Sequence, residues 1–288
     1  MSAVLQVQNL CKEYPLFRLE NVSFSIDKPE IMGFIGRNGA GKTTTLKSLL
    51  NLVHPTSGTI TFWDMNLSNH ETQIKQRVGY AAGQTSYYQR KKICEIADIT
   101  KTFYTNWDGE QYRHYLDQFS LDENKKLTEL SEGMKVKFSL ALALSHHAEL
   151  LILDEPTSGL DPVSREELLE QFMDIADAGT AILFSTHIIS DLEKCADGIT
   201  YIQNGTILAS EGLTTFQDRY RLVELDSEVS GNADTLSDAQ RDRVLGIRRN
   251  RKCRTALINK DDAPVFDPLP VSTPDLEAIM SHLEADKK

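Results

Sequence analysis

Residues 36–43 constrain the fold of this 288-residue chain more than any other segment. Their sequence, GRNGAGKT, fits the pattern GxxxxGK[ST], and it lies between an apolar run at 31–35 and leucines at helical spacing in 43–52. Glycines allow the backbone to fold into a nest of inward-pointing N–H groups, and the following helix directs its positive end toward the same point. The pattern therefore predicts a buried strand, a phosphate-binding loop and a helix in succession.

Individual positions of this loop have distinct chemical roles in a nucleotide site. The Lys42 ammonium can reach the β- and γ-phosphates, and the Thr43 hydroxyl is a ligand for Mg²⁺. We also expect nucleotide contacts from the neighbouring positions Asn38, Gly39, Ala40, Gly41 and Thr44. A tight strand–helix turn without a ligand is the alternative, and the strand before and helix after the loop argue against it.

A pair of carboxylates, Asp154 and Glu155, directly follows the apolar run 150–153. Carboxylates at the end of a buried strand are unfavourable unless they bind a cation or take part in a reaction. In a nucleotide site Asp154 would hold Mg²⁺, and Glu155 would accept a proton from the attacking water. His187 follows the next apolar strand, 181–185, and could contact a γ-phosphate or hold the water and Glu155. The alternatives are a polar turn and a surface histidine.

The rest of the chain has a mixed α/β pattern. The strands 150–153 and 181–185 flank a helical pattern at 162–178, and this strand–helix–strand unit favours a parallel sheet. Residues from about 83 to 146 have mainly helical spacing. After residue 212 the character changes to short strands, turns and a closing amphipathic helix, for which we expect Thr273 as the N-cap.

Five motifs in this order resemble those of the ATP-binding subunit of an ABC transporter. They are the phosphate loop 36–43, the signature-like sequence LSEGM at 130–134, the carboxylates Asp154 and Glu155, the D-loop-like sequence SGLD at 158–161, and His187. The resemblance covers roughly residues 1–212. Within that family, the sequences at 131–134 and 103–107 are similar to the BcrA/YtrB-like exporters of peptides and bacitracin.

The resemblance implies further site residues. Tyr14 would stack on adenine, Ser131, Gly133 and Asp161 would contact nucleotide, and Gln84 would bind nucleotide and Mg²⁺ together with Thr43 and Asp154. Lys42, Glu155 and His187 would be the catalytic residues. The sequence departs from the family pattern at two places: Gln84 comes one residue late, and Glu132 stands where the signature has glycine. Because a carboxylate would repel a γ-phosphate, we expect the Glu132 side chain to point away from the nucleotide.

The implied architecture is a P-loop NTPase core with an antiparallel β-subdomain and an inserted helical subdomain at about 84–146, together forming an ABC ATPase domain at 1–212. A small α+β extension would occupy 213–288. Two such ATPase subunits, as a homodimer or pseudo-homodimer, would pair head to tail and clasp ATP. They would drive an integral membrane permease on a separate chain, docked near residues 86–104, and export peptides, antibiotics or other amphipathic compounds.

Net charge and hydropathy limit the partners and the location that we expect for this chain. With 31 Lys and Arg against 42 Asp and Glu, the net charge of −11 gives no reason to expect nucleic acid as a partner. Apolar stretches are too short to cross a bilayer, and we expect a cytoplasmic protein that is peripheral on the inner face of the membrane. A soluble ABC ATPase acting on nucleic acid or ribosomes, and a low-turnover regulatory subunit, are the two competing functions. The basic stretch 241–254 is expected to be a solvated surface.

Overall fold

The computed structural model describes residues 2–82, 89–225, 236–249 and 253–285. It divides into two compact units, Met1–Ser210 and Glu211–Lys288, and each is described by itself. This division falls two residues before the boundary expected at residue 212. Among the described residues, the structure has no helix of the length and apolar character that a membrane span requires.

A six-stranded sheet forms the centre of the first unit, in the order β10-β9-β3-β8-β7-β6. The strands are β3 (Ile31–Ile35), β6 (Val78–Ala82), β7 (Leu150–Asp154), β8 (Ala181–Thr186), β9 (Gly198–Gln203) and β10 (Thr206–Gly212). Strand β3 pairs in parallel with β8 and β9, and β7 pairs in parallel with β6 and β8. Every residue of β3 and β8 is buried, as expected for continuous apolar runs in a parallel sheet covered on both faces.

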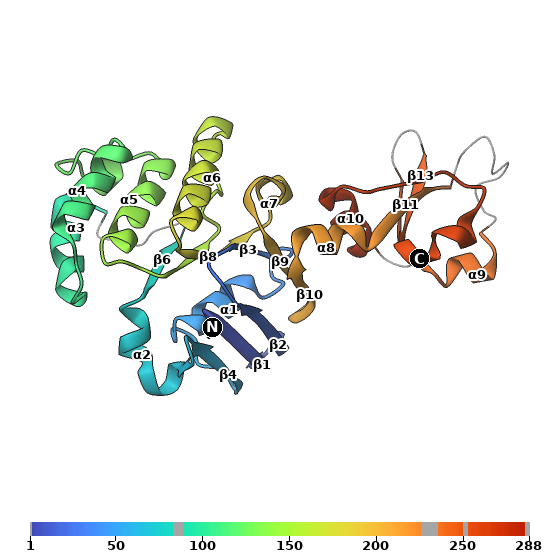
Figure 1. The fold of residues 1–288 in the computed structure, drawn as a ribbon, viewed down its shortest axis with the longest axis horizontal. Helices are drawn as coiled ribbons and strands as arrows, with labels where there is room; N and C mark the ends of the chain where they lie inside the picture. Colours follow the sequence, from blue (N-terminus) through green and yellow to red (C-terminus); the bar gives the residue numbers. More distant parts are fainter. Residues whose placement is uncertain (1, 83–88, 226–235, 250–252, 286–288) are drawn as a thin grey trace. The chain divides into compact units, whose positions relative to one another are not determined.

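Helices connect the parallel strands (Figure 1). They include α6 (Pro162–Asp177), between β7 and β8, and α7 (Ile189–Cys195), between β8 and β9, whereas α1 (Lys42–Leu49) leads from β3 into a second sheet. Helix α1 ends three residues before the expected position, because Asn51 adopts the left-handed conformation with φ 57° and stops it. Asp161 caps α6 by accepting hydrogen bonds from the backbone N–H groups of Val163 and Ser164.

A second, antiparallel sheet has the order β2-β1-β4-β5. Its strands are β1 (Leu5–Tyr14), β2 (Phe17–Ile26), β4 (Ser57–Phe62) and β5 (Met65–Asn66), and α2 (Leu67–Lys75) follows. The hairpin strands β1 and β2 are longer than their apolar runs indicate, because irregular pairing in β1 keeps Leu10 on the buried face. Side chains of both sheets share one hydrophobic core, in which Phe24 and Phe34 pack with ring centroids 5.3 Å apart.

A helical region lies between β6 and β7 in the sequence and forms a cluster beside the sheet (Figure 1). It contains α3 (Ile93–Thr100), η1 (Lys101–Phe103), α4 (Gly109–Gln118), η2 (Leu127–Glu129) and α5 (Glu132–Leu144). Helix α5 packs against β6 and α4 and is almost wholly buried beyond its first turn. Together with the two sheets it gives the fold class expected from the sequence.

The second unit is a small α+β fold. Its antiparallel sheet has the order β12-β13-β11-β14, formed by β11 (Tyr220–Glu224), β12 (Val244–Arg249), β13 (Arg254–Asn259) and β14 (Val271–Ser272). The helices are α8 (Leu213–Asp218), α9 (Asp238–Arg241), η3 (Lys260–Phe266) and α10 (Leu276–Leu283). The expected Thr273 cap is wrong: Asp275 caps α10 by accepting a hydrogen bond from the Ala278 N–H, so the helix begins two residues later than expected.

Candidate functional site

The phosphate-binding loop connects β3 to α1 and has the backbone that its glycines predict. Gly39 and Gly41 have φ angles of 84° and 118°, a region that side chains rarely adopt. A Cβ atom on Gly41 would also lie 2.5 Å from Leu19 and 3.0 Å from the Phe17 ring. Glycine at position 41 is therefore required both by its backbone conformation and by the hairpin packed against it.

The Lys42 side chain is buried in this loop. Its ammonium donates hydrogen bonds to the carbonyl oxygens of Gly36 and Arg37, at 2.7 and 3.4 Å, and lies 3.2 Å from Glu155 Oε1. Only 5% of the residue is exposed. The protein thus holds a positive charge at the centre of the loop, where a phosphate group would meet it.

Three oxygen-bearing side chains meet at the carboxyl ends of β7 and β8. Asp154 Oδ1 accepts hydrogen bonds from Thr43 Oγ1 at 3.3 Å and from Ser185 Oγ at 2.7 Å. Ser185 Oγ in turn accepts a hydrogen bond from the Glu155 N–H at 3.0 Å. A hydroxyl and a carboxylate in contact form a donor set of the kind that Mg²⁺ prefers, so Thr43 and Asp154 fit the metal role expected of them.

Glu155 occupies a strained position at the end of β7. Its φ angle of 52° lies in the left-handed region, which is uncommon for a residue other than glycine. Its backbone N–H donates to the Ser185 carbonyl at 3.1 Å, and its carboxylate lies between Lys42 Nζ and His187 Nδ1, the latter 2.7 Å from Oε2. The fold therefore brings together a carboxylate, an ammonium and an imidazole from three separate segments.

These groups line one groove of about 1510 Å³. The expected site residues on its wall are Asn38, Gly39, Gly41, Lys42, Thr43, Thr44, Asp154, Glu155 and His187. Ala40 is buried behind the loop, and Ser131, Gly133 and Asp161 are not on the wall. Ser131 instead caps α5, accepting a hydrogen bond from the Met134 N–H, and Gln84 lies outside the described residues.

Glu132, which we expected to point away from the nucleotide, borders this groove together with Lys135. The two side chains form an ion pair at 2.7 Å within the first turns of α5. The lysine neutralises the carboxylate locally, so the departure from glycine does not leave an unpaired negative charge on the wall.

The two aromatic side chains next to the β1–β2 turn, Tyr14 and Phe17, differ in their position. Tyr14 is 43% exposed, is not on the groove wall, and has the Lys12 ammonium 5.5 Å from its ring centroid. Phe17 lies on the wall beside Gly41 and packs against the hydrophobic core. The sequence reasoning missed Phe17 and Ser185. An aromatic residue three positions after Tyr14, and a serine two positions before His187, were the available signals.

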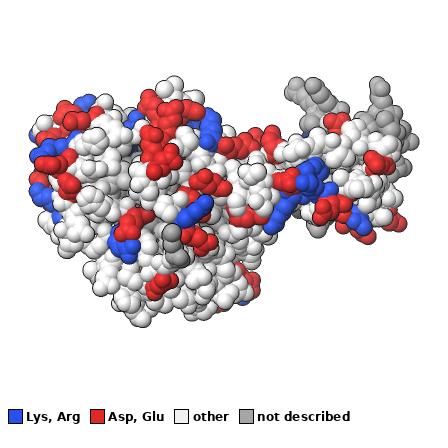
Figure 2. Space-filling model, in the orientation of Figure 1, with Lys and Arg blue, Asp and Glu red and all other residues white. Residues whose placement is uncertain are grey.

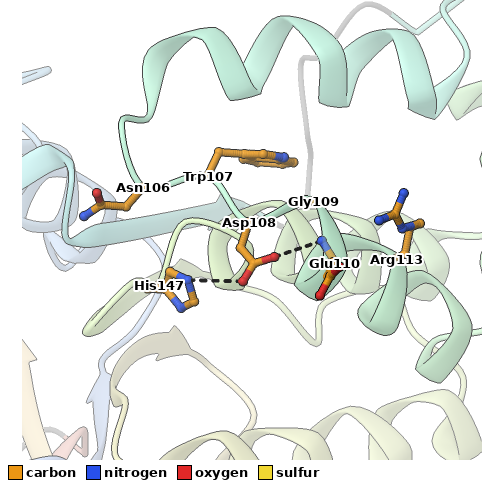
Figure 3. Close-up of a pocket in the computed structure, with 7 residues that line it drawn as sticks. All are labelled: Asn106, Trp107, Asp108, Gly109, Glu110, Arg113 and His147. Carbon is orange, nitrogen blue, oxygen red and sulfur yellow. Dashed lines mark hydrogen bonds and ion pairs between the residues drawn. The ribbon is translucent and has the colours of Figure 1, made fainter.

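A second, shallower hollow of about 610 Å³ lies in the helical region (Figure 3). Asp108 caps α4 here, accepting hydrogen bonds from the N–H groups of Glu110 and Gln111, and its Oδ2 lies 3.6 Å from His147 Nε2. The backbone hydrogen bonds from Gln111 and Glu110 lower the pKa of the Asp108 carboxyl. The carboxylate is thus engaged in capping the N-terminus of α4, and the nearby His147 and Arg113 lower its pKa further.

The stretch 86–104, expected to receive a permease, is described from residue 89 onward. Phe103 is 70% exposed, whereas Tyr104 stacks on the buried His146 ring with centroids 3.7 Å apart. Gln76 holds this turn from the other side, donating to the Phe103 carbonyl at 2.7 Å and accepting from the Thr105 N–H at 2.9 Å. Phe103 is thus presented on a turn that is fixed by its neighbours.

Comparison with known proteins gives a consistent result. A family model described as ABC transporter matches residues 19–158. The ABC transporter ATP-binding protein YtrB of Bacillus subtilis is 31% identical over 74% of this chain and 73% of its own length. The bacitracin transport ATP-binding protein BcrA of Bacillus licheniformis is 34% identical over 72% of this chain and 69% of its own. A solved ATP-binding subunit of an ABC transporter superposes with a TM-score of 0.67 at 28% identity, covering 74% of this chain and 92% of that one.

Proposed function

The chain belongs to the family of ABC transporter ATP-binding proteins, which are ATPases, and we propose that it powers export through an integral membrane permease carried on a separate chain. The observation that carries this proposal is the arrangement of Lys42, Glu155 and His187 at one end of the groove. These three groups supply a phosphate-binding cation, a general base and an imidazole within contact of one another.

The chemistry that we propose for this chain is hydrolysis of the γ-phosphate of ATP. Lys42 binds the β- and γ-phosphates and offsets their charge. In this structure its ammonium contacts Glu155 and two loop carbonyls. Glu155 accepts a proton from the attacking water, and His187 holds the Glu155 carboxylate in place. Thr43 and Asp154 would hold Mg²⁺, which would supply charge neutralisation at the phosphates. Gln84 is proposed as a further nucleotide and metal contact on family resemblance alone.

We further propose that two ATPase subunits pair head to tail around ATP, as a homodimer or pseudo-homodimer. Ser131, Gly133 and Asp161 lie off the groove wall of their own chain, which is consistent with contacts to nucleotide on a partner subunit. ATP then favours the closed pair and hydrolysis releases it, so the nucleotide acts on a two-state equilibrium. Residues 1–212 form the ATPase domain and 213–288 a C-terminal extension in this proposal.

The proposed cargo is peptides, antibiotics or similar amphipathic compounds, because BcrA is named for bacitracin transport. The permease would dock beside Phe103, and the chain would lie on the cytoplasmic face of the membrane. On the face drawn in Figure 2, acidic and basic side chains of the first unit are interspersed and form no continuous basic surface. With the net charge of −11, this distribution gives no support to a nucleic-acid partner.

Isolation of the full-length chain from native membranes tests the proposal. We expect an integral membrane protein to co-purify with it, and we expect ATP hydrolysis by the complex to be abolished by Lys42→Ala. A chain that binds no adenine nucleotide, or that is fully active with alanine at position 42, would overturn the proposed ATPase role. A Lys42-dependent ATPase that co-purifies with ribosomes instead of a permease would overturn the transport role alone.

A further inference from the structure

Two buried polar side chains and a partly buried arginine form a group next to the segments that carry Glu155 and His187. Thr157 follows the catalytic strand β7, Arg165 lies in α6, and Asp191 lies in the first turn of α7; we call them the anchor cluster. Helices α6 and α7 pack against each other. Asp191 is 1% exposed and Thr157 is fully buried. A carboxylate in such a place is unfavourable unless its neighbours compensate for the lost water.

The neighbours of Asp191 compensate only in part for the water that its carboxylate loses on burial. Burial raises the pKa of its carboxyl, while the Thr157 hydroxyl and the Arg165 charge, helped by Lys194, act in the opposite direction, and Glu166 adds to the rise. Asp191 Oδ2, Thr157 Oγ1 and Arg165 Nε nevertheless make no hydrogen bond of ordinary geometry. A buried polar cluster whose hydrogen bonds are incomplete contributes little to the free energy of folding. We infer that it instead fixes one arrangement of the segments that carry its residues.

One side of the anchor cluster is tied to the catalytic strand end and the D-loop-like segment. Arg165 Nη2 donates to the Leu160 carbonyl at 3.5 Å, and the Leu160 N–H donates to the Thr157 carbonyl at 3.3 Å. The Ser158 N–H donates to the Glu155 carbonyl at 3.2 Å. A displacement of Thr157 would therefore be transmitted to Glu155, which lies two residues earlier.

The other side is tied to the histidine loop. The Asp191 N–H donates to the Ile188 carbonyl at 3.3 Å, and the Ile188 N–H donates to Thr186 Oγ1 at 2.9 Å. His187 lies between the residues joined by these bonds. The position of Asp191 therefore fixes where helix α7 begins after the loop that carries His187. Thr157 is thus linked to the segment that carries Glu155, and Asp191 to the segment that carries His187.

We propose that Asp191 is a positioning residue, which acts through Thr157 and Arg165 to hold His187 against Glu155. This inference rests on the proposed ATPase function and adds a residue outside the groove to it. Loss of the anchor cluster would let the two groups separate by a fraction of an ångström, and misplacement on that scale lowers turnover strongly without preventing substrate binding. The side chains of Lys42 and Thr43 bond to the loop carbonyls, Glu155 and Asp154 and not to the cluster, so nucleotide affinity should not change.

The test compares Asp191→Asn, which keeps the shape and removes the charge, with Thr157→Val and with the control Glu166→Gln. Glu166 is an exposed acid on α6, paired with Lys194, and it lies near Asp191 without belonging to the cluster. In the full-length chain we expect Asp191→Asn and Thr157→Val to lower kcat about tenfold. We expect KM for ATP and the thermal shift produced by ATP to stay within about twofold of the parent. The control should retain parental kcat.

A double-mutant cycle separates positioning from a general structural role. If Asp191 acts through His187, Asp191→Asn should cause no further loss of kcat in a His187→Ala background. Amide exchange at 186–191 should also rise in the nucleotide-free Asp191→Asn chain. Additive losses of kcat, unchanged exchange, or a parental kcat in Asp191→Asn would each overturn the inference. Because Lys42→Ala is assayed alongside, a failure of this inference is distinguished from a failure of the ATPase function.

Discussion

His187 Nδ1 and Glu155 Oε2 lie 2.7 Å apart, and this contact joins the ends of two neighbouring parallel strands. An ionised carboxylate can only accept hydrogen bonds, so the imidazole donates through Nδ1 and its Nε2 is directed elsewhere. The opposite oxygen of Glu155 faces Lys42 at 3.2 Å. In the proposed mechanism, phosphate would replace Glu155 as the partner of Lys42, and Glu155 would keep the histidine contact and have an oxygen free to accept a proton.

The first prediction concerns Glu155. Replacing it by glutamine keeps the contacts to Lys42 and His187 in shape but removes the group that accepts the proton. We expect ATP turnover to fall at least about 100-fold, with nucleotide affinity retained and the ATP-bound dimer made longer-lived. Phosphate release measures turnover, and size-exclusion chromatography with light scattering measures the dimer. Glu170→Gln, an exposed change on α6, is the matched control and should behave as the parent. Near-parental turnover in Glu155→Gln would remove this residue from the role of base.

The second prediction concerns Ser185, a buried residue whose hydroxyl connects the Asp154 carboxylate with the backbone of Glu155. It donates to Asp154 Oδ1 and accepts from the Glu155 N–H. Ser185→Ala removes one hydrogen bond from each group, while Asp154 keeps the bond from Thr43 and the Glu155 N–H keeps the backbone carbonyl at position 185, so we expect a cost of about 1 kcal/mol of folding free energy. We expect a higher Mg²⁺ concentration for half-maximal ATPase activity and a lower kcat. Urea unfolding and a Mg²⁺ titration measure the two effects. The exposed Ser190→Ala is the control, and an unchanged Mg²⁺ requirement in Ser185→Ala would contradict the prediction.

Linear motifs were sufficient to predict the loop 36–43, Asp154, Glu155 and His187. Each lies at or just beyond the carboxyl end of a parallel strand, so the continuous apolar runs of β3, β7 and β8 already placed them at one edge of the sheet. The family resemblance added the motif names and the expected partners. The fold class followed from the same alternation of apolar strands and helices.

Other features depend on contacts between distant segments, which a linear pattern does not contain. The role of Ser185 arises because β7 and β8 are paired in register at Asp154 and Ser185. The approach of Phe17 to Gly41 depends on how the β1–β2 hairpin bends over the loop. The N-cap of α10 was placed at Thr273 and not at Asp275, because Thr and Asp are both favoured caps and only the observed bond from the Ala278 N–H to Asp275 distinguishes them.

The third prediction concerns which aromatic residue, Phe17 or Tyr14, stacks on the adenine base. Phe17 lies on the groove wall and Tyr14 does not, so we expect Phe17→Ala to weaken ATP binding more than Tyr14→Ala does. Loss of one base–aromatic stacking contact corresponds to about 1–3 kcal/mol, or roughly 5- to 150-fold in affinity. Binding of inorganic tripolyphosphate, which has no base, should be the same in both variants. Calorimetric titration measures all these affinities. A larger loss with Tyr14→Ala would restore the assignment made from the family resemblance.

The last prediction concerns stability and pH. Burial lowers the pKa of His146 from 6.5 to about 4, and the ring is stacked on Tyr104. The unfolded chain therefore takes up a proton at this residue between pH 6.5 and 4, while the folded chain does not. Acidification through that window should remove up to about 3 kcal/mol of folding free energy, and stability should be regained as the pH rises to 6.5.

His146→Gln, which cannot titrate, should show a smaller loss between these pH values in urea unfolding. His147→Gln changes an exposed neighbouring histidine and is the matched control. Equal slopes for the parent and His146→Gln would show that the buried ring is not the group that responds to acid.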